Sequence, residues 1–117
     1  GGAWPEPLHT LTQTRPGDLP DAVVGAIRVG FRRLSPSAQQ TLIAAAVVGE
    51  RVSEAILGRA TGLSPADLTA ALDELEWQRW LQAEPRGYGF VARVVREVVD
   101  HDMVTPGQRG RILASLG

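Results

Sequence analysis

The chain has 117 residues, of which 44% are hydrophobic and 21% charged, and a formal net charge of −1 at pH 7. This length fits one domain with a hydrophobic core, and the near-zero charge gives no global attraction to nucleic acid or to an anionic membrane. The absence of cysteine excludes a disulfide framework and a thiolate metal site. Because no apolar run approaches the roughly 20 residues of a membrane helix, and no signal-peptide pattern begins the sequence, we expect a cytoplasmic protein with no membrane contact.

Residues 1–18 are predicted to form an extended lead-in or linker, and residues 19–116 a folded domain. Prolines and a glycine recur in the first segment, and its apolar residues show no periodicity. Two of these apolar residues, Trp4 and Leu8, could dock onto the folded domain. The first helix is expected over residues 20–34, where apolar residues recur at helical spacing.

Three further helices are predicted from a serine or threonine that directly precedes a proline. The hydroxyl of such a residue caps the first helical turn, and proline suits the first helical position because its missing N–H would have no partner there. On this basis we expect helices over residues 36–48, 65–79 and 106–116. A shorter helix, capped by Ser53, is expected to end near Gly62.

The pattern changes after the helix over residues 65–79. Two short segments, 81–84 and 88–91, flank the turn sequence Pro85-Arg86-Gly87, which predicts a two-stranded β-hairpin. Valines then recur at a helical period between residues 94 and 103, which predicts one more helix.

This order of elements is typical of a mainly α winged helix-turn-helix domain, with a small β-hairpin wing and additional flanking helices. The helix over residues 65–79 takes the place of the recognition helix, and residues 81–91 form the wing.

Several segments also carry a resemblance to a known family. They are Leu19-Pro20-Asp21-Ala22-Val23 leading to Arg33-Leu34-Ser35-Pro36, Leu42-Ile43-Ala44-Ala45-Ala46-Val47-Val48-Gly49, Leu68 through Leu75, and Tyr88-Gly89-Phe90 followed by Val95-Arg96-Glu97. In order and spacing, the chain resembles the winged-helix domain that follows the ATPase module of bacterial STAND-class signal-transduction ATPases, which include large LuxR-type regulators. The resemblance covers residues 19–116 and implies a regulatory domain beside an ATPase module.

The chain departs from that family at two positions. The family's histidine, which can sense the nucleotide on the neighbouring ATPase, falls on Ala92, and alanine has no hydrogen-bonding side chain. The resemblance therefore does not carry nucleotide sensing over to this chain. The glycine that the family has before the wing falls on Arg79, so the turn there must form without glycine.

Charge argues against the DNA binding that a winged-helix shape suggests. The predicted recognition helix carries Asp67, Asp73, Glu74 and Glu76 against Arg79 alone, a net charge of −3, and the wing adds only Arg86. A helix in the major groove approaches two phosphate strands, and binding there usually needs several arginine or lysine contacts. Direct DNA reading is therefore the weaker alternative.

The sequence gives little support for catalysis. His9 and His101 lie far apart, and neither belongs to a spaced set with carboxylates, so we expect no catalytic residues and no metal site. All twelve basic residues are arginine, so the Gly-Lys-Ser/Thr of a P-loop is absent. We expect neither enzyme activity nor a bound cofactor.

Trp77 is the main candidate for a partner contact. On a helical wheel it lies about 180° from the apolar face, while Trp80 lies between the two faces. Tryptophan is enriched in interface hot spots, so we expect Trp77, with Glu74, Arg79 and Trp80, to contact the ATPase module of the same parent chain or another protein. The alternative is that Trp77 is covered by the lead-in around Trp4 or lies on the surface without a partner.

Two arginines after the wing, Arg93 and Arg96, are candidates for a contact with a phosphate or an acidic surface. The alternative is that they form ion pairs with nearby Glu97 or Asp100 on solvated faces.

The sequence thus predicts a non-catalytic regulatory and interaction domain of a larger signal-transduction ATPase or transcriptional regulator, which contacts protein rather than DNA. A DNA-binding winged-helix domain of a transcriptional regulator is one alternative. A structural spacer between an ATPase and a downstream repeat region is another.

Overall fold

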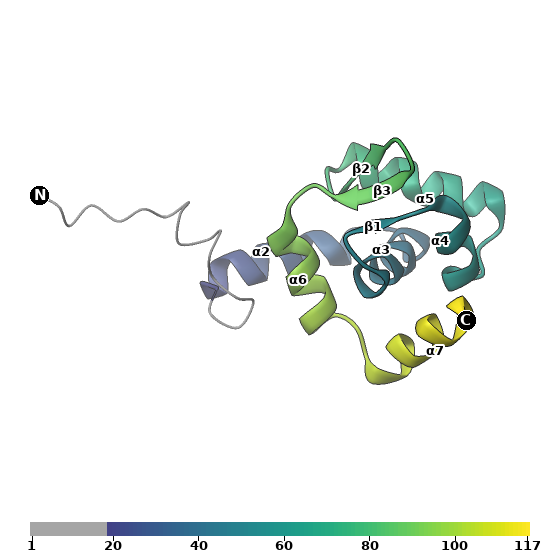
Figure 1. Cartoon of the computed structure of the whole chain (residues 1–117). Coiled ribbons are helices and arrows are strands. Elements are labelled where there is room, and N and C mark those ends of the chain that lie inside the picture. Colours follow the sequence, from purple (N-terminus) through teal and green to yellow (C-terminus); the bar gives the residue numbers. More distant parts are fainter. Residues whose placement is uncertain (1–18) are drawn as a thin grey trace, which may run out of the picture.

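The computed structural model describes residues 19–117, which form a mainly helical winged helix-turn-helix domain (Figure 1). The predicted lead-in over residues 1–18, with the docking of Trp4 and Leu8 and the position of His9, lies outside the described residues. The elements in chain order are α2 (Asp21–Arg32), α3 (Pro36–Val48), β1 (Arg51–Val52), α4 (Glu54–Thr61), α5 (Pro65–Trp77), β2 (Leu81–Glu84), β3 (Gly87–Phe90), α6 (Arg93–Asp102) and α7 (Pro106–Leu116).

The helix starts predicted from hydroxyl–proline pairs are confirmed. The hydroxyl of Ser35 accepts a hydrogen bond from the backbone N–H three residues later, at 3.2 Å, and that of Ser64 does the same at 3.1 Å. At α7 the capping is reciprocal: Thr105 accepts from the N–H of Gln108 at 3.1 Å, and the Gln108 side chain accepts from the N–H of Thr105 at 2.9 Å. These side chains satisfy donors that the first turn of a helix leaves free.

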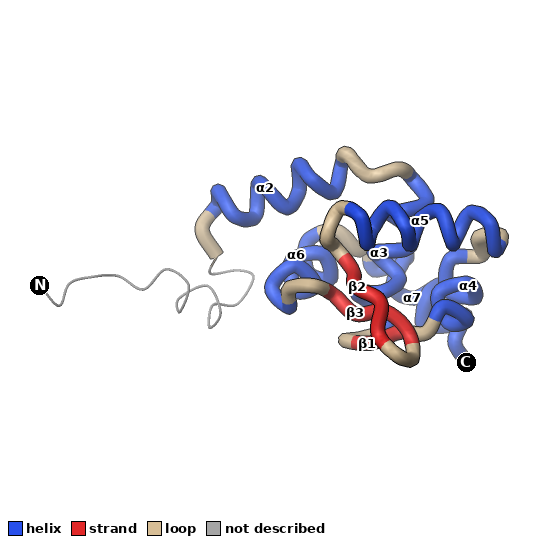
Figure 2. The backbone as a smooth tube through the Cα atoms, turned by 90° about the horizontal axis from the view of Figure 1, so that it is seen from above, coloured by secondary structure: helices blue, strands red, loops and turns tan. Residues whose placement is uncertain are grey.

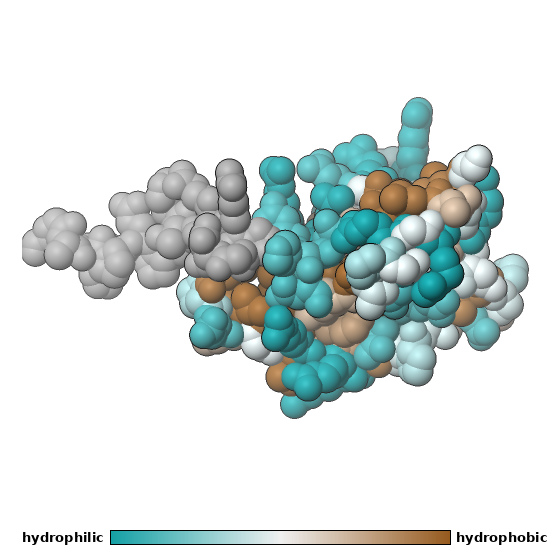
Figure 3. Space-filling view, turned by 90° about the horizontal axis from the view of Figure 1, so that it is seen from below, coloured by the Kyte–Doolittle hydropathy of each residue, from teal (hydrophilic) through white to brown (hydrophobic). Residues whose placement is uncertain are grey.

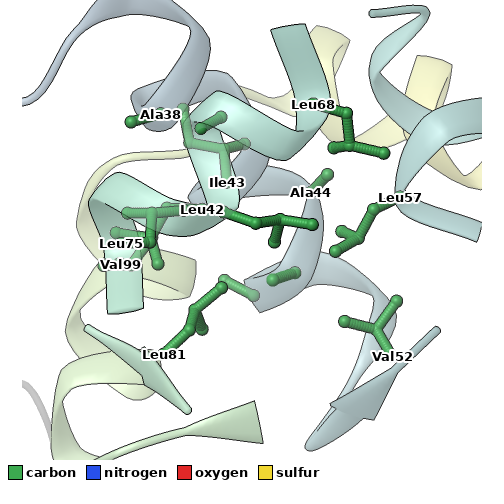
Figure 4. Packing of buried hydrophobic residues seen from close by; sticks show 14 of the residues in the cluster. Ala38, Leu42, Ile43, Ala44, Val52, Leu57, Leu68, Leu75, Leu81 and Val99 are labelled. Carbon is green, nitrogen blue, oxygen red and sulfur yellow. The ribbon is translucent and has the colours of Figure 1, made fainter. Parts of the chain in front are cut away.

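Helix α3 is the centre of the domain, and α4, α5, α6 and α7 all contact it. Its buried positions lie all around the helix rather than along one stripe, as expected for a helix enclosed by others. Figure 4 shows Leu42 of α3 among side chains from the surrounding elements, including Leu57, Leu75 and Leu81. All four leucines are fully buried, and burying one such side chain contributes about 1.5–3 kcal/mol.

The wing contains a strand that the sequence did not predict. Besides the predicted hairpin of β2 and β3, the two-residue strand β1 pairs with β3, so the antiparallel sheet has the order β1-β3-β2. The register sets Val52 opposite Tyr88 and Leu81 opposite Phe90. A strand of two residues is too short to show an alternating pattern, and only the pairing with β3 defines it.

The flanking helices lie on different sides of this core. Helix α6 contacts α3 and β3, and α7 contacts α3 and α4. Helix α2 contacts α6 and lies to one side of the molecule in Figures 1 and 2. No helix within residues 19–117 combines the length and the apolar character needed to cross a membrane.

Gly87 is required where the hairpin meets β1. Its φ is 154°, and a Cβ on this residue would overlap the backbone carbonyl of Val52. Gly25, on α2, differs because a Cβ there would meet nothing within 4 Å.

We expect Gly87→Ala to lower the free energy of unfolding by on the order of 2 kcal/mol, because the added methyl group separates β3 from β1. Gly25→Ala is the control, and it should raise stability by roughly 0.5–1 kcal/mol, since alanine favours a helix more than glycine does. Urea denaturation of both variants measures the two changes. Equal stability of Gly87→Ala and the parent chain would contradict the close contact between the strands.

Candidate functional site

Trp77 ends α5 on the side of the helix that faces away from the core. Its exposure is 86%, whereas Leu68, Leu72 and Leu75 of the same helix are buried. The prediction that this indole points outward is confirmed.

Other exposed apolar side chains do not approach that exposure. Val29, Val91 and Leu113 are the other large exposed hydrophobic residues among residues 19–117, and the most exposed of them, Leu113, reaches 52%. Figure 3, which views the molecule from below, shows hydrophobic patches separated by hydrophilic side chains. Single exposed apolar residues are ordinary on protein surfaces, but an almost completely exposed tryptophan marks a candidate contact point.

Two carboxylates accompany this indole. Asp73 precedes Trp77 by four residues and therefore lies on the same side of α5, and Glu76 is its neighbour in sequence. These three residues line a surface depression of about 340 Å³. We call Asp73, Glu76 and Trp77 the Trp77 face.

Carboxylates of α4 and α5 also affect a tyrosine on the wing. Burial raises the pKa of the Tyr88 hydroxyl on β3, and the carboxylates of Glu76, Glu54 and Asp73 raise it further. A carboxylate raises the pKa of a nearby phenol because it disfavours the phenolate anion. Two glutamates and one aspartate, from α4 and α5, thus lie close enough to Tyr88 to affect its ionisation.

Glu74 is not available for the partner contact predicted from the sequence. Its carboxylate accepts hydrogen bonds from the backbone N–H of Ser35, at 2.9 Å, and from the Ser35 hydroxyl, at 2.7 Å. The side chain thus connects α5 to the start of α3. Ser35 and Glu74 are distant in sequence, so no local pattern could have revealed this role.

Trp80 also packs against other residues of the domain. It is half-buried against the core, and its ring lies over α2 at Gly30, where a Cβ would come within 3.0 Å of Trp80 Cζ2. The expectation that Trp80 faces a partner is therefore corrected: the large ring fills the space that glycine leaves on α2.

Arg79, at the position where the resembled family has glycine, adopts the left-handed backbone conformation. Its φ is 67°, the only positive value of a non-glycine residue among residues 19–117. The N–H of Arg79 donates to the Glu76 carbonyl at 3.1 Å, and the N–H of Trp80 donates to the Leu75 carbonyl at 2.8 Å. This pair of bonds is the Schellman ending of a helix, in which glycine is the usual residue. The exposed Arg79 side chain remains a candidate partner contact.

The predicted pair Arg93 and Arg96 has two different environments. Arg96 Nε donates to the carbonyl of Ala46 at 3.2 Å, which ties α6 to the last turn of α3. Arg93 is exposed and lies 3.6 Å from Glu97, as the ion-pair alternative expected. Ala92, at the position of the family's histidine, immediately precedes α6 and makes no side-chain capping bond.

Both arginines line a surface pocket of about 480 Å³, together with Glu50, Arg51, Glu84 and Phe90. Arg51 Nε lies 3.1 Å from Glu84 Oε2, which is close enough for an ion pair. The two groups are not aligned for a hydrogen bond. Three arginines and two glutamates leave a small positive excess, and much of the arginine charge is already paired. A phosphate contact at Arg93 or Arg96 stays a prediction.

The histidine near the end of α6 belongs to a local charge cluster. His101 Nδ1 lies 2.8 Å from Asp102 Oδ1, and Arg28 of α2 donates to Asp102 Oδ2 at 3.1 Å. The bond with His101, and after it the one from Arg28, lowers the pKa of Asp102. No group of three or more potential metal ligands occurs within the described part of the chain.

No protein-family model matches the chain, and comparisons with curated proteins and with solved structures find no match. The resemblance to the STAND-class winged-helix domain therefore depends on the sequence segments alone.

We expect the two neighbouring tryptophans to differ in their contribution to stability. Trp80→Ala should lower the free energy of unfolding by about 2 kcal/mol or more, because it leaves a cavity between α5 and α2. Trp77→Ala should change it by less than about 0.5 kcal/mol, because the indole is exposed. Chemical denaturation of both variants tests this difference, and a large loss for Trp77→Ala would place that residue in the core.

Proposed function

We propose that this chain is a non-catalytic regulatory domain of a larger cytoplasmic signal-transduction ATPase or transcriptional regulator. The observation that carries the proposal is the Trp77 face, with its indole exposed at 86% beside two carboxylates. The partner is the ATPase module of the same parent chain or another protein. The rigid helical body would transmit or restrain the state of that partner through an interface with two arrangements.

The charge on α5 favours a protein partner over DNA. In a winged helix that reads DNA, the recognition helix and the wing approach phosphates. Here Asp67 and Asp73 are exposed on that helix, Glu76 is half-buried, and the wing turn supplies Arg86 alone. Carboxylates at these positions repel the phosphate backbone, which usually dominates the affinity of a protein for DNA.

A titration with duplex DNA tests the alternative directly. At about 50 mM salt, where phosphate contacts are strong, we expect no saturable binding of DNA by the 117-residue chain. Fluorescence anisotropy of a labelled duplex is the measurement. Tight binding that weakens steeply with added salt would overturn the proposal and establish the DNA-binding alternative.

Association with the ATPase module provides the positive test. We expect Trp77→Ala to weaken the binding of this chain to the separately expressed ATPase module of its parent protein by at least about tenfold, as removal of a hot-spot tryptophan does. Isothermal titration calorimetry gives the dissociation constants.

The matched control for this experiment is Leu113→Ala on α7, which removes another exposed apolar side chain. It should leave the dissociation constant unchanged. A parent reading frame without a P-loop motif upstream would remove the basis for the ATPase partner.

A further inference from the structure

We propose that the Trp77 face binds a cationic segment of the protein partner, with an arginine or lysine side chain lying against the indole and paired with Asp73 and Glu76. This inference rests on the proposed function, because it specifies the chemistry of the partner at the same site. The indole of Trp77 is the most exposed large apolar side chain among residues 19–117.

An exposed indole attracts cations through its ring face. A guanidinium or ammonium group within about 6 Å of the ring centre is attracted by the ring's electron density, and tryptophan is the most effective of the aromatic residues. Trp77 is at the end of α5, and the depression beside it is bounded by Asp73 and Glu76. A cation over this ring therefore lies next to two carboxylates.

The two carboxylates remain available for an external cation. None of the ion pairs found within residues 19–117 involves Asp73 or Glu76. Neither side chain takes part in a side-chain hydrogen bond of that region, in contrast to Glu74, which Ser35 occupies. A guanidinium group suits such a site because it can pair with a carboxylate and stack on an aromatic ring at the same time.

The surrounding charge supports a positively charged partner rather than a neutral one. The pKa of Tyr88 is raised first by burial and then by Glu76, Glu54 and Asp73, so carboxylates of α4 and α5 lie near the same side chain. A purely apolar partner would bury these carboxylates without a counter-charge, which is unfavourable. A cationic segment replaces their hydration with ion pairs.

The binding experiment uses the 117-residue chain labelled with ¹⁵N and a nona-arginine peptide as the probe, with a nona-glutamate peptide in parallel. The indole N–H signals of the tryptophans are followed by NMR, and Trp77→Phe assigns the signal of Trp77. We expect nona-arginine to shift that signal saturably while the signal of the half-buried Trp80 stays in place. Nona-glutamate should shift neither.

The double variant Asp73→Asn/Glu76→Gln tests the role of the carboxylates. It should raise the dissociation constant for nona-arginine by at least about tenfold, since charge-assisted hydrogen bonds and cation attraction are both weakened. Asp21→Asn/Glu50→Gln is the matched control, because it removes two exposed carboxylates outside the Trp77 face, one on α2 and one in the connection between α3 and β1, and changes the net charge equally. At physiological salt, where charges beyond about 8 Å are screened, the control should bind almost as the parent chain does.

Three results would overturn the inference: an unchanged Trp77 signal, an equal loss in the control variant, or a Trp77 signal that shifts with protein concentration alone. The last would mean that a second copy of the chain covers the face. These results are distinct from a failure of the proposed function. If Trp77→Ala weakens binding to the ATPase module and Asp73→Asn/Glu76→Gln does not, the protein contact stands and its cationic chemistry is excluded.

Discussion

Enclosure of α3 is the constraint on which the rest of this structure depends. Ala38, Ala44, Ala45 and Ala46 are all buried, and such small side chains allow neighbouring helices to approach the α3 backbone closely. Helices α4, α5, α6 and α7 surround α3 and supply the larger side chains that fill the space between them. The apolar surface of one central helix thus determines where every surrounding helix lies, as expected when burial is the main favourable contribution to folding.

Polar contacts then hold the two ends of α3. At its start, the Glu74 carboxylate of α5 accepts two hydrogen bonds from Ser35, and near its end the guanidinium of Arg96 donates to the Ala46 carbonyl. Both contacts use groups at helix ends, where backbone donors and acceptors lack partners within the helix. These contacts orient α5 and α6 relative to the core. They also give structural roles to Glu74 and Arg96, which the sequence analysis named as candidate contact residues.

The local features of this fold could be predicted from the sequence, and the long-range ones could not. Hydroxyl–proline pairs start α3, α5 and α7 because the capping residue and its partner are three positions apart, so the sequence itself contains both. The outward direction of Trp77 also follows from the helical period. By contrast, β1, the Glu74–Ser35 contact and the packing of Trp80 on Gly30 need segments that are distant in the chain, and one sequence shows no sign of such pairs.

Contacts at the C-terminal end of α5 fix the Trp77 face to two other helices. Glu74 holds the helix to α3, and Trp80, just after the helix, holds it to α2 through the surface at Gly30. Arg79, with its backbone in the left-handed conformation, makes the sharp turn that lets Trp80 reach α2 while Trp77 stays exposed. Under the proposed function, a partner that engages Trp77 therefore acts on a segment fixed to two other helices. A force on this face would act on α3 and α2 through these contacts rather than on a flexible loop.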